Sequence, residues 1–182
     1  LRVVLDSEEE NGSPALGPAL AAHRDLVRGD LLVTGDGPVH PSGRPLLFYG
    51  NRGVFDFNLT VYGPVRGLHS GHYGNWAPNP AMRLSQLLAS MKDASGRVTI
   101  DGFYADVVPL TARERAAVDA LPKNDAELMR ELQFGEPEGG GRMLADLINE
   151  PSLNIRGLRS AYVGDESQNV VPDRAQASCD IR

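Results

Sequence analysis

The sequence lacks several features that define common classes of protein. It has one cysteine, Cys179, so no disulfide can form within the chain, and this favours a reducing compartment such as the cytoplasm. No apolar run is long enough to span a bilayer. The formal net charge is -6, with 18 Lys and Arg against 24 Asp and Glu, so no positive field would attract nucleic acid. With 41% hydrophobic residues, the composition fits a soluble globular protein.

Both ends of the chain carry strand patterns. Residues 1–5 form an apolar run, and residues 174–182 alternate between apolar and polar side chains. Cys179 falls on the apolar face of the second pattern, so we expect it to be a small core residue rather than a nucleophile. Because chains rarely start or stop inside strands, we expect the sequence to be part of a longer protein.

Residues 1–43 have the pattern of a piece of a parallel α/β sheet. Strands are predicted over residues 1–6 and 31–34, with a helix between them from the Ser13-Pro14 start to about Val27. The Gly- and Pro-rich residues 35–43 are the predicted hinge into a second unit.

Carboxylates follow both predicted strands of this unit. Glu8, Glu9 and Glu10 come after the first strand, and Asp36 comes after the second. Acidic residues before a helix can simply favour its positive end, and an aspartate before Gly37 can be a turn residue. The carboxyl ends of strands are also where α/β sheets gather ligands, and paired carboxylates can hold a metal and accept a proton from water. On the residues alone, both interpretations stay open.

The middle of the chain joins a strand, a histidine-bearing turn and a helix. Residues 54–62 alternate as a half-buried strand, and Asn79-Pro80 has the form of a helix start, with Asn79 as N-cap. His69 and His72 lie in the turn between them. They can be ordinary surface histidines. A histidine fixed between a strand and a capped helix is, however, also well placed to reach out of its own domain, and His69 has this position.

The helix that follows carries an apolar stripe with two possible uses. Its members share the i, i+3, i+4, i+7 spacing: Leu84, Leu87, Leu88 and Met91. The stripe can contribute to a contact with a second copy of the chain, or it can be used entirely to cover the helix's own sheet.

The remaining motifs complete an α+β pattern. Thr111-Ala112-Arg113-Glu114 has the form of a capping box, and Leu128, Met129 and Leu132 mark a further helix. Gly139-Gly140-Gly141 precedes a third helix, and strands are predicted over residues 152–158 and 169–182.

The order of these motifs resembles the lid, or dimerisation, domain of the M20 family of metallopeptidases, in the dipeptidase branch that includes carnosinases. The motifs that carry the resemblance are Leu68-His69-Ser70-Gly71, Asn79-Pro80, Gly96-Arg97-Val98 and Gly102-Phe103-Tyr104. The resemblance implies that residues 1–43 are part of a catalytic α/β domain and that residues 44–182 are an incomplete lid. Such a lid is a four-stranded antiparallel sheet with helices on one face, and its usual form has one more helix and strand.

The resemblance also implies a metal-dependent hydrolase, in which metal-bound water attacks a peptide or amide bond. The family pattern Glu-Glu-x-Gly-Ser fits residues 9–13, which makes Glu9 the general base and Glu10 a metal ligand. Asp36 matches a further ligand, and two zinc ions, or manganese or cobalt, would be the metals. The only His-x-Asp triplet, His23-Arg24-Asp25, falls inside the predicted helix, where we expect His23 to be a packed residue rather than part of the family's first metal-binding motif. We therefore expect the chain alone to be inactive.

Three further residues gain roles from the same resemblance. His69 matches a histidine that reaches into the active site of the partner subunit of a homodimer and stabilises the oxyanion. Arg182 matches an arginine that binds the substrate's terminal carboxylate, and Asn169 stands at a substrate contact where the branch usually has threonine. A small peptide or an N-acyl amino acid would be the substrate. The alternative is a stand-alone dimerisation or binding module without catalysis.

Overall fold

The computed structural model describes residues 1–37, 39–40 and 42–182. The chain divides into two compact units, Leu1–His40 and Pro41–Arg182, and each is described here by itself. The division falls in the predicted hinge, of which Pro38 and Pro41 lie outside the described residues. In the described part of the chain, no helix has both the length and the apolar character needed to cross a membrane.

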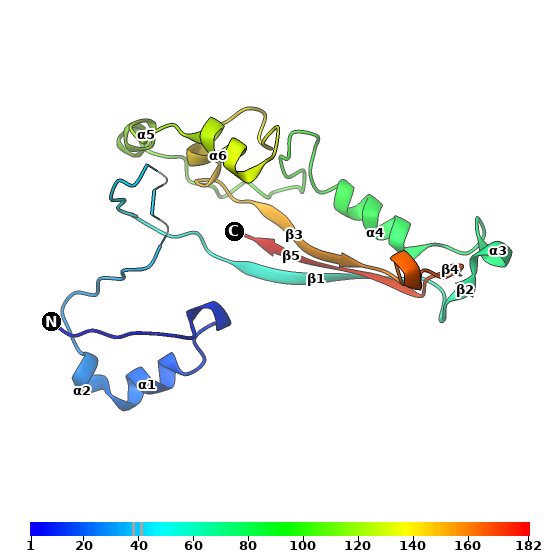
Figure 1. Cartoon of the computed structure of the whole chain (residues 1–182), viewed down its shortest axis with the longest axis horizontal. Helices are drawn as coiled ribbons and strands as arrows, with labels where there is room; N and C mark the ends of the chain where they lie inside the picture. Colours follow the sequence, from blue (N-terminus) through cyan, green and yellow to red (C-terminus); the bar gives the residue numbers. More distant parts are fainter. Residues whose placement is uncertain (38, 41) are drawn as a thin grey trace. The chain divides into compact units, whose positions relative to one another are not determined.

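The described residues of the first unit form three short helices, of which α1 and α2 are labelled in Figure 1. They are η1 (Glu9–Asn11), α1 (Leu16–Ala22) and α2 (Arg24–Val27). The prediction of one helix that starts at Ser13-Pro14 is wrong in two respects: α1 begins at Leu16, and the helical run breaks at His23. Ser13 does not cap α1, because its hydroxyl donates to the carboxylate of Asp6 instead.

The strands predicted over residues 1–6 and 31–34 are also wrong. Both segments lack ladder pairing with any described residue. Their apolar side chains, such as Leu5, Leu31 and Leu32, are largely exposed. An extended segment becomes a strand only when a neighbouring strand supplies hydrogen bonds, so an apolar run alone does not fix the structure.

The described residues of the second unit form two antiparallel sheets in place of the predicted four-stranded one. Strands β1 (Phe55–Tyr62), β5 (Arg174–Ile181) and β3 (Leu153–Arg159) form the first sheet, with β5 in the centre. Strands β2 (Leu68–His69) and β4 (Val170–Val171) form the second. The other elements are α3 (Ser70–Tyr73), α4 (Pro80–Ala89), α5 (Ala112–Asp119), α6 (Asp125–Leu132), α7 (Leu144–Leu147) and η2 (Gly164–Glu166).

The predicted strand over residues 169–182 is divided at Pro172. Proline has no amide hydrogen for a ladder, so β4 ends there and the chain enters the other sheet as β5. The same change of sheet occurs after β1, where the Gly63 amide donates to the carbonyl of Asp173 at 2.7 Å. A Cβ at Gly63 would lie 2.8 Å from Cδ of Pro80, so only glycine lets the turn approach α4 this closely.

The core of the second unit lies between α4 and one face of the three-stranded sheet (Figure 1). Leu84 and Leu88 of α4 are buried against Ala177 and Cys179 of β5. This confirms Cys179 as a core residue, and burial, with a smaller contribution from the charge of Asp180, raises the pKa of its thiol. Of the two uses foreseen for the α4 stripe, covering its own sheet is therefore the one seen for Leu84 and Leu88.

Two predicted helix starts are confirmed in detail. Asn79 accepts hydrogen bonds from the amides of the first turn of α4, and Pro80 stands at the first helical position. Thr111 and Glu114 form a complete capping box at α5, in which the Thr111 amide donates to Glu114 at 2.7 Å.

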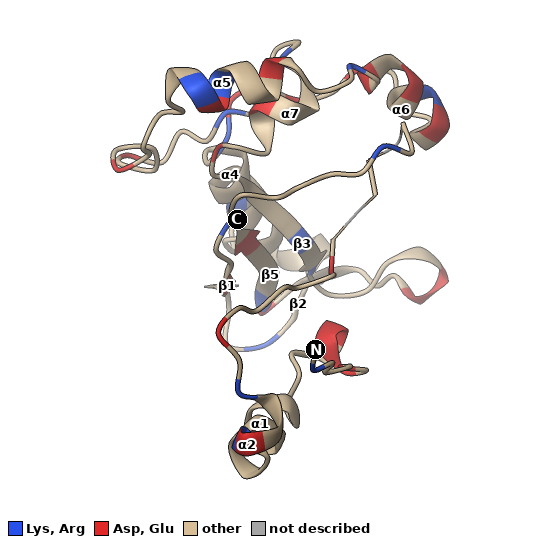
Figure 2. Ribbon diagram, turned by 90° about the vertical axis from the view of Figure 1, so that its left-hand side faces the viewer, with Lys and Arg blue, Asp and Glu red and all other residues tan. Residues whose placement is uncertain are grey.

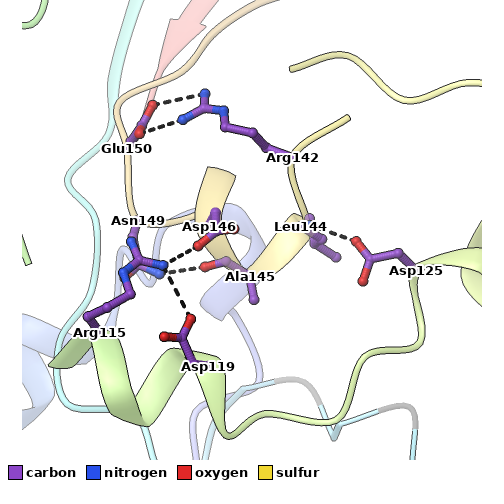
Figure 3. A network of polar contacts seen from close by, with 9 residues as sticks. All are labelled: Arg115, Asp119, Asp125, Arg142, Leu144, Ala145, Asp146, Asn149 and Glu150. Atoms are coloured by element: carbon purple, nitrogen blue, oxygen red, sulfur yellow. Dashed lines mark hydrogen bonds and ion pairs between the residues drawn. The ribbon is translucent and has the colours of Figure 1, made fainter. Parts of the chain in front are cut away.

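Helices α5, α6 and α7 are joined by charged side chains rather than by a shared apolar core (Figure 3). Arg115 of α5 pairs with Asp146 of α7, and Asp125 of α6 accepts from the first amide of α7, at Leu144, at 2.7 Å. Arg142 holds Glu150 through two hydrogen bonds of 2.7 and 3.1 Å. Acidic and basic residues accordingly lie side by side on these helices (Figure 2).

Candidate functional site

The acidic turn of the first unit is folded around Asp6. Its carboxylate accepts from the hydroxyl of Ser13 and from the amide of Glu8 at 3.0 Å, and these hydrogen bonds lower its pKa. Glu9 and Glu10 stand on η1 with exposed side chains. Asp6 was not singled out in the sequence, although an aspartate before a turn commonly accepts from the amide two residues on, as it does here from Glu8.

The predicted metal ligands do not form a metal site by themselves. Asp36 is exposed at the end of the extended segment before Gly37, and Glu10 is exposed on η1. Across residues 1–37, 39–40 and 42–182, no three His, Cys, Asp or Glu side chains come together as a ligand set. A catalytic zinc needs about three protein ligands, so the described residues do not fit the metal without further ligands.

His69 is fixed by the turn that it begins. Its Nδ1 accepts the amide hydrogen of Gly71 at 3.0 Å, so the side chain caps α3. Its ring also stacks on that of His72, with 4.7 Å between the ring centroids. Because Nδ1 is an acceptor, the neutral ring carries its proton on Nε2. His69 therefore presents an N–H donor on an exposed side chain.

Asn169 is brought next to His69 by the small sheet. His69 pairs with Val170 in the β2–β4 register, and the Asn169 carbonyl accepts from the amide of Ser70 at 3.0 Å. Two of the predicted site residues, 100 positions apart in the sequence, are thus neighbours. The sequence did not predict this pairing, because the 169–182 segment looked like a single strand.

A groove of about 510 Å³ lies beside this small sheet. Its wall includes Ser70 and Val170, the direct neighbours of His69 and Asn169, together with Trp76 and the Met82 and Arg83 side of α4. Trp76 is largely exposed, and its ring is tilted against that of Tyr73 at 6.2 Å between centroids. Trp76 and Arg83 were not proposed as site residues from the sequence, where a tryptophan in the turn before Asn79-Pro80 is the signal that could have found this wall.

Arg182 lies at the end of the three-stranded sheet that is farther from the small sheet. It directly follows β5, and its amide and carbonyl both bond to Ser152 at 3.0 Å. The start of β5 adjoins β4, so the full length of β5 separates Arg182 from His69. Eight residues of strand span about 27 Å. Since an extended dipeptide is about 7 Å long, one copy of the chain cannot place both side chains on the same dipeptide.

The comparisons with known proteins agree with this architecture. Residues 49–182 match the model of the M20 peptidase dimerisation domain. The chain is 28% identical to the Cys-Gly metallodipeptidase of Candida albicans over 100% of its length, and 28% identical to the human Beta-Ala-His dipeptidase, also over 100%. The crystal structure of an M20 family metallo-carboxypeptidase from Sulfolobus solfataricus is similar, with a TM-score of 0.78 and 29% identity over 96% of this chain and 40% of that one.

The chain spans 38% and 37% of the length of these two dipeptidases. The match to the dimerisation domain covers most of the chain and includes β1, α4 and both sheets. The chain belongs to the M20 peptidase family, and residues 49–182 are its dimerisation domain.

Proposed function

We propose that this chain is part of a metal-dependent dipeptidase, in which the dimerisation domain also completes the active site. The observation that carries the proposal is the extent of the similarity. The dimerisation-domain match begins at residue 49, but the matches to the Cys-Gly metallodipeptidase and the Beta-Ala-His dipeptidase continue over the whole chain. They therefore include the first unit, where Glu9, Glu10 and Asp36 lie, and a module used only for dimerisation has no need of that segment.

In this proposal, Glu9 is the general base that accepts a proton from the attacking water. Its exposed carboxylate has no hydrogen bond or ion pair with any described residue, so it is available for that task. Glu10 and Asp36 are proposed metal ligands, and the remaining ligands would come from outside this chain. The proposed metals are zinc, manganese or cobalt, and they would supply Lewis-acid chemistry at the scissile bond.

His69 is the proposed oxyanion donor, and it acts from a second copy of the chain. The cap on α3 leaves Nε2–H as its outward donor, and such a donor can stabilise the charge that develops on a carbonyl oxygen. The separation of His69 from Arg182 supports action between subunits. If Arg182 binds the carboxylate end of a dipeptide, the His69 that reaches the same substrate must belong to another copy. A homodimer through the domain at residues 49–182 would provide it.

The substrate class follows from the same residues. Arg182 would bind a terminal carboxylate, and the groove beside Asn169 and Trp76 offers space for a small peptide side chain. Dipeptides such as Cys-Gly and Beta-Ala-His are the substrates to test first, because they give two relatives their names. A cytoplasmic location stays a prediction from the single cysteine.

Hydrolysis assays test the proposal. The complete protein that contains this chain should hydrolyse dipeptides, lose the activity with a chelator and regain it with zinc, manganese or cobalt. His69→Ala should lower kcat by about 100- to 1,000-fold, as expected for loss of one oxyanion donor. His72→Ala is the comparison variant: it removes the ring that stacks on His69 but keeps the cap of α3 by His69, so it should lower kcat far less than His69→Ala does. A metal-loaded protein that dimerises but hydrolyses neither dipeptides nor N-acyl amino acids would support the non-catalytic module instead.

The chain of 182 residues should show no hydrolysis by itself, with or without added metal. The reason is that its described residues hold no complete ligand set. Activity of the purified chain that disappears in Glu9→Gln would contradict this expectation.

A further inference from the structure

The guanidinium group of Arg182 is hydrogen-bonded through Nε, and its two terminal nitrogens are exposed. Its Nε donates to Oδ2 of Asp180 at 3.3 Å, while its main chain is fixed by the two bonds to Ser152. The side chain is 53% exposed, and neither terminal nitrogen has a partner among the residues that the structure describes. The two terminal nitrogens are the pair that grips a carboxylate end-on through parallel hydrogen bonds.

Asp180 is the only charged residue in the described part of the chain that is buried, with 7% of its surface exposed. It lies on the face of the central strand β5 opposite to Cys179, where polar side chains line the sheet. Its second oxygen, Oδ1, accepts from Asn154 on β3 at 2.9 Å. Asn154 is directly opposite Asp180 in the β3–β5 register, so the carboxylate is held from the neighbouring strand.

Buried carboxylates are retained when they are hydrogen-bonded and paired, and both conditions hold for Asp180. A structural carboxylate could be satisfied by Asn154 alone. The second oxygen instead engages the edge of Arg182 and leaves its terminal nitrogens exposed. Asp56 lies opposite Asp180 on the neighbouring strand β1 and pairs with Arg156 at 2.7 Å. The nearby Arg156 thus has its own carboxylate partner.

We propose that Asp180 is a positioning residue, which holds Arg182 through Nε so that its two terminal nitrogens bind the substrate's carboxylate end-on. This inference rests on the proposed function, because it assumes that Arg182 binds a terminal carboxylate. Asn154 orients Asp180, and Asp180 orients Arg182. The pairing of β3 with β5 therefore determines the direction in which Arg182 meets the substrate. Specificity for a free carboxyl terminus thus depends on a residue that does not touch the substrate.

The test compares Cys-Gly with its C-terminal amide as substrates of the complete protein. Arg182→Ala should raise KM for the dipeptide and abolish the preference for it over the amide. Asp180→Ala should raise KM for the dipeptide about tenfold, the effect of one hydrogen bond to a charged group, while kcat and the KM of the amide change less than about twofold. Asp180→Asn, which keeps one acceptor oxygen, should have a smaller effect.

The double variant Asp180→Ala/Arg182→Ala separates positioning from a structural role. It should be no worse than Arg182→Ala, because Asp180 acts only through Arg182. Asp173→Ala, which removes a carboxylate next to β5 at its other end, is the control and should leave the preference unchanged.

Three results would overturn the inference in different ways. Equal losses with the dipeptide and its amide would make Asp180 a structural residue only. Additive effects in the double variant would show that Asp180 does not act through Arg182. An unchanged preference in Arg182→Ala, with hydrolysis intact, would remove the carboxylate-binding role of Arg182 itself while leaving the proposed dipeptidase in place.

Discussion

The two units of the chain use similar sequence patterns with opposite results. In the first unit, residues 1–6 and 31–34 are apolar and extended, yet they pair with no described strand and leave side chains such as Leu32 exposed. In the second unit, the alternating residues of β1 pair along the whole strand with β5, and their apolar face packs under α4. The difference shows that a strand pattern needs a partner strand and a covering layer before it becomes a sheet.

The contrast also separates the proposed site residues into two groups. Glu9, Glu10 and Asp36 stand on short or irregular segments of the first unit, whereas His69, Asn169 and Arg182 are fixed by strand pairing in the second. Precise placement of a catalytic side chain requires a rigid scaffold. We therefore infer that the second unit already holds its proposed site residues in fixed positions. The carboxylates of the first unit would need the rest of a catalytic domain to hold them in place.

The largest effect should come from removing core volume in the second unit. Leu84 is 0% exposed, so Leu84→Ala should lower the free energy of unfolding by about 2–5 kcal/mol. Leu32 is 87% exposed, and Leu32→Ala in the first unit should change it by less than about 0.5 kcal/mol. Urea unfolding followed by circular dichroism measures both, and equal losses would show that the first unit has a core that the exposure of Leu32 does not indicate.

A second test probes the close approach of β1 and α4. Gly63→Ala would place a methyl group 2.8 Å from Pro80, and such overpacking should cost about 1–3 kcal/mol. Gly53→Ala adds the same methyl group where no atom lies within 4 Å, so it should be neutral or slightly stabilising. Thermal unfolding of the two variants distinguishes steric contact from the general effect of replacing glycine. If Gly63→Ala is as stable as Gly53→Ala, the turn after β1 is not tightly packed.

A smaller effect is expected at the start of α4. Asn79→Ala removes the side chain that accepts from the amides of Ala81 and Met82, at a cost of about 1 kcal/mol. Gln86→Ala, on an exposed position of the same helix, should be close to neutral. The urea midpoint of each variant gives the comparison, and a loss at Gln86 as large as that at Asn79 would argue against the cap.

The smallest expected effect is the loss of stability at low pH that comes from Asp180. Hydrogen bonds from Asn154, and then from Arg182, hold the pKa of Asp180 below its ordinary value of 3.8. A carboxylate with a lowered folded pKa stabilises the fold above its unfolded pKa, and this stabilisation is lost as the pH falls through the folded pKa. Between pH 5 and about pH 2, the wild-type chain should therefore lose its stability advantage over Asp180→Asn. If the urea midpoints of the wild-type chain and Asp180→Asn differ by the same amount at every pH in this range, the lowered pKa of Asp180 is contradicted.

The sequence predicts the elements of the second unit well and their connections less well. Asn79-Pro80, the Thr111 capping box and the apolar face around Cys179 are local signals, and the structure confirms each of them. Pro172 is a local signal for the division of β4 from β5, but which sheet each part joins depends on the strands available for pairing. In the first unit the same patterns over-predict strands, because the hydrogen-bonding partner is decided by tertiary structure.

For the candidate site, the sequence identifies residue types but not their grouping. The six predicted residues stay predictions as functional groups. The neighbourhood of His69 and Asn169 comes from a sheet of two short strands, too brief to show periodicity. Asp180 and Arg182 are only two positions apart in the sequence. Their contact could not be predicted to position Arg182, because Asp180 is held by Asn154 of the distant strand β3.

The most direct test of the account is subunit complementation in the complete protein. His69→Ala and Glu9→Gln should each be nearly inactive as homodimers. After subunit exchange, half of the dimers are hybrids, and each hybrid has one site with both Glu9 and the partner's His69, so the mixture should recover about a quarter of the wild-type rate. A mixture that stays as inactive as its components, with exchange verified by mass, would contradict the action of His69 across the dimer.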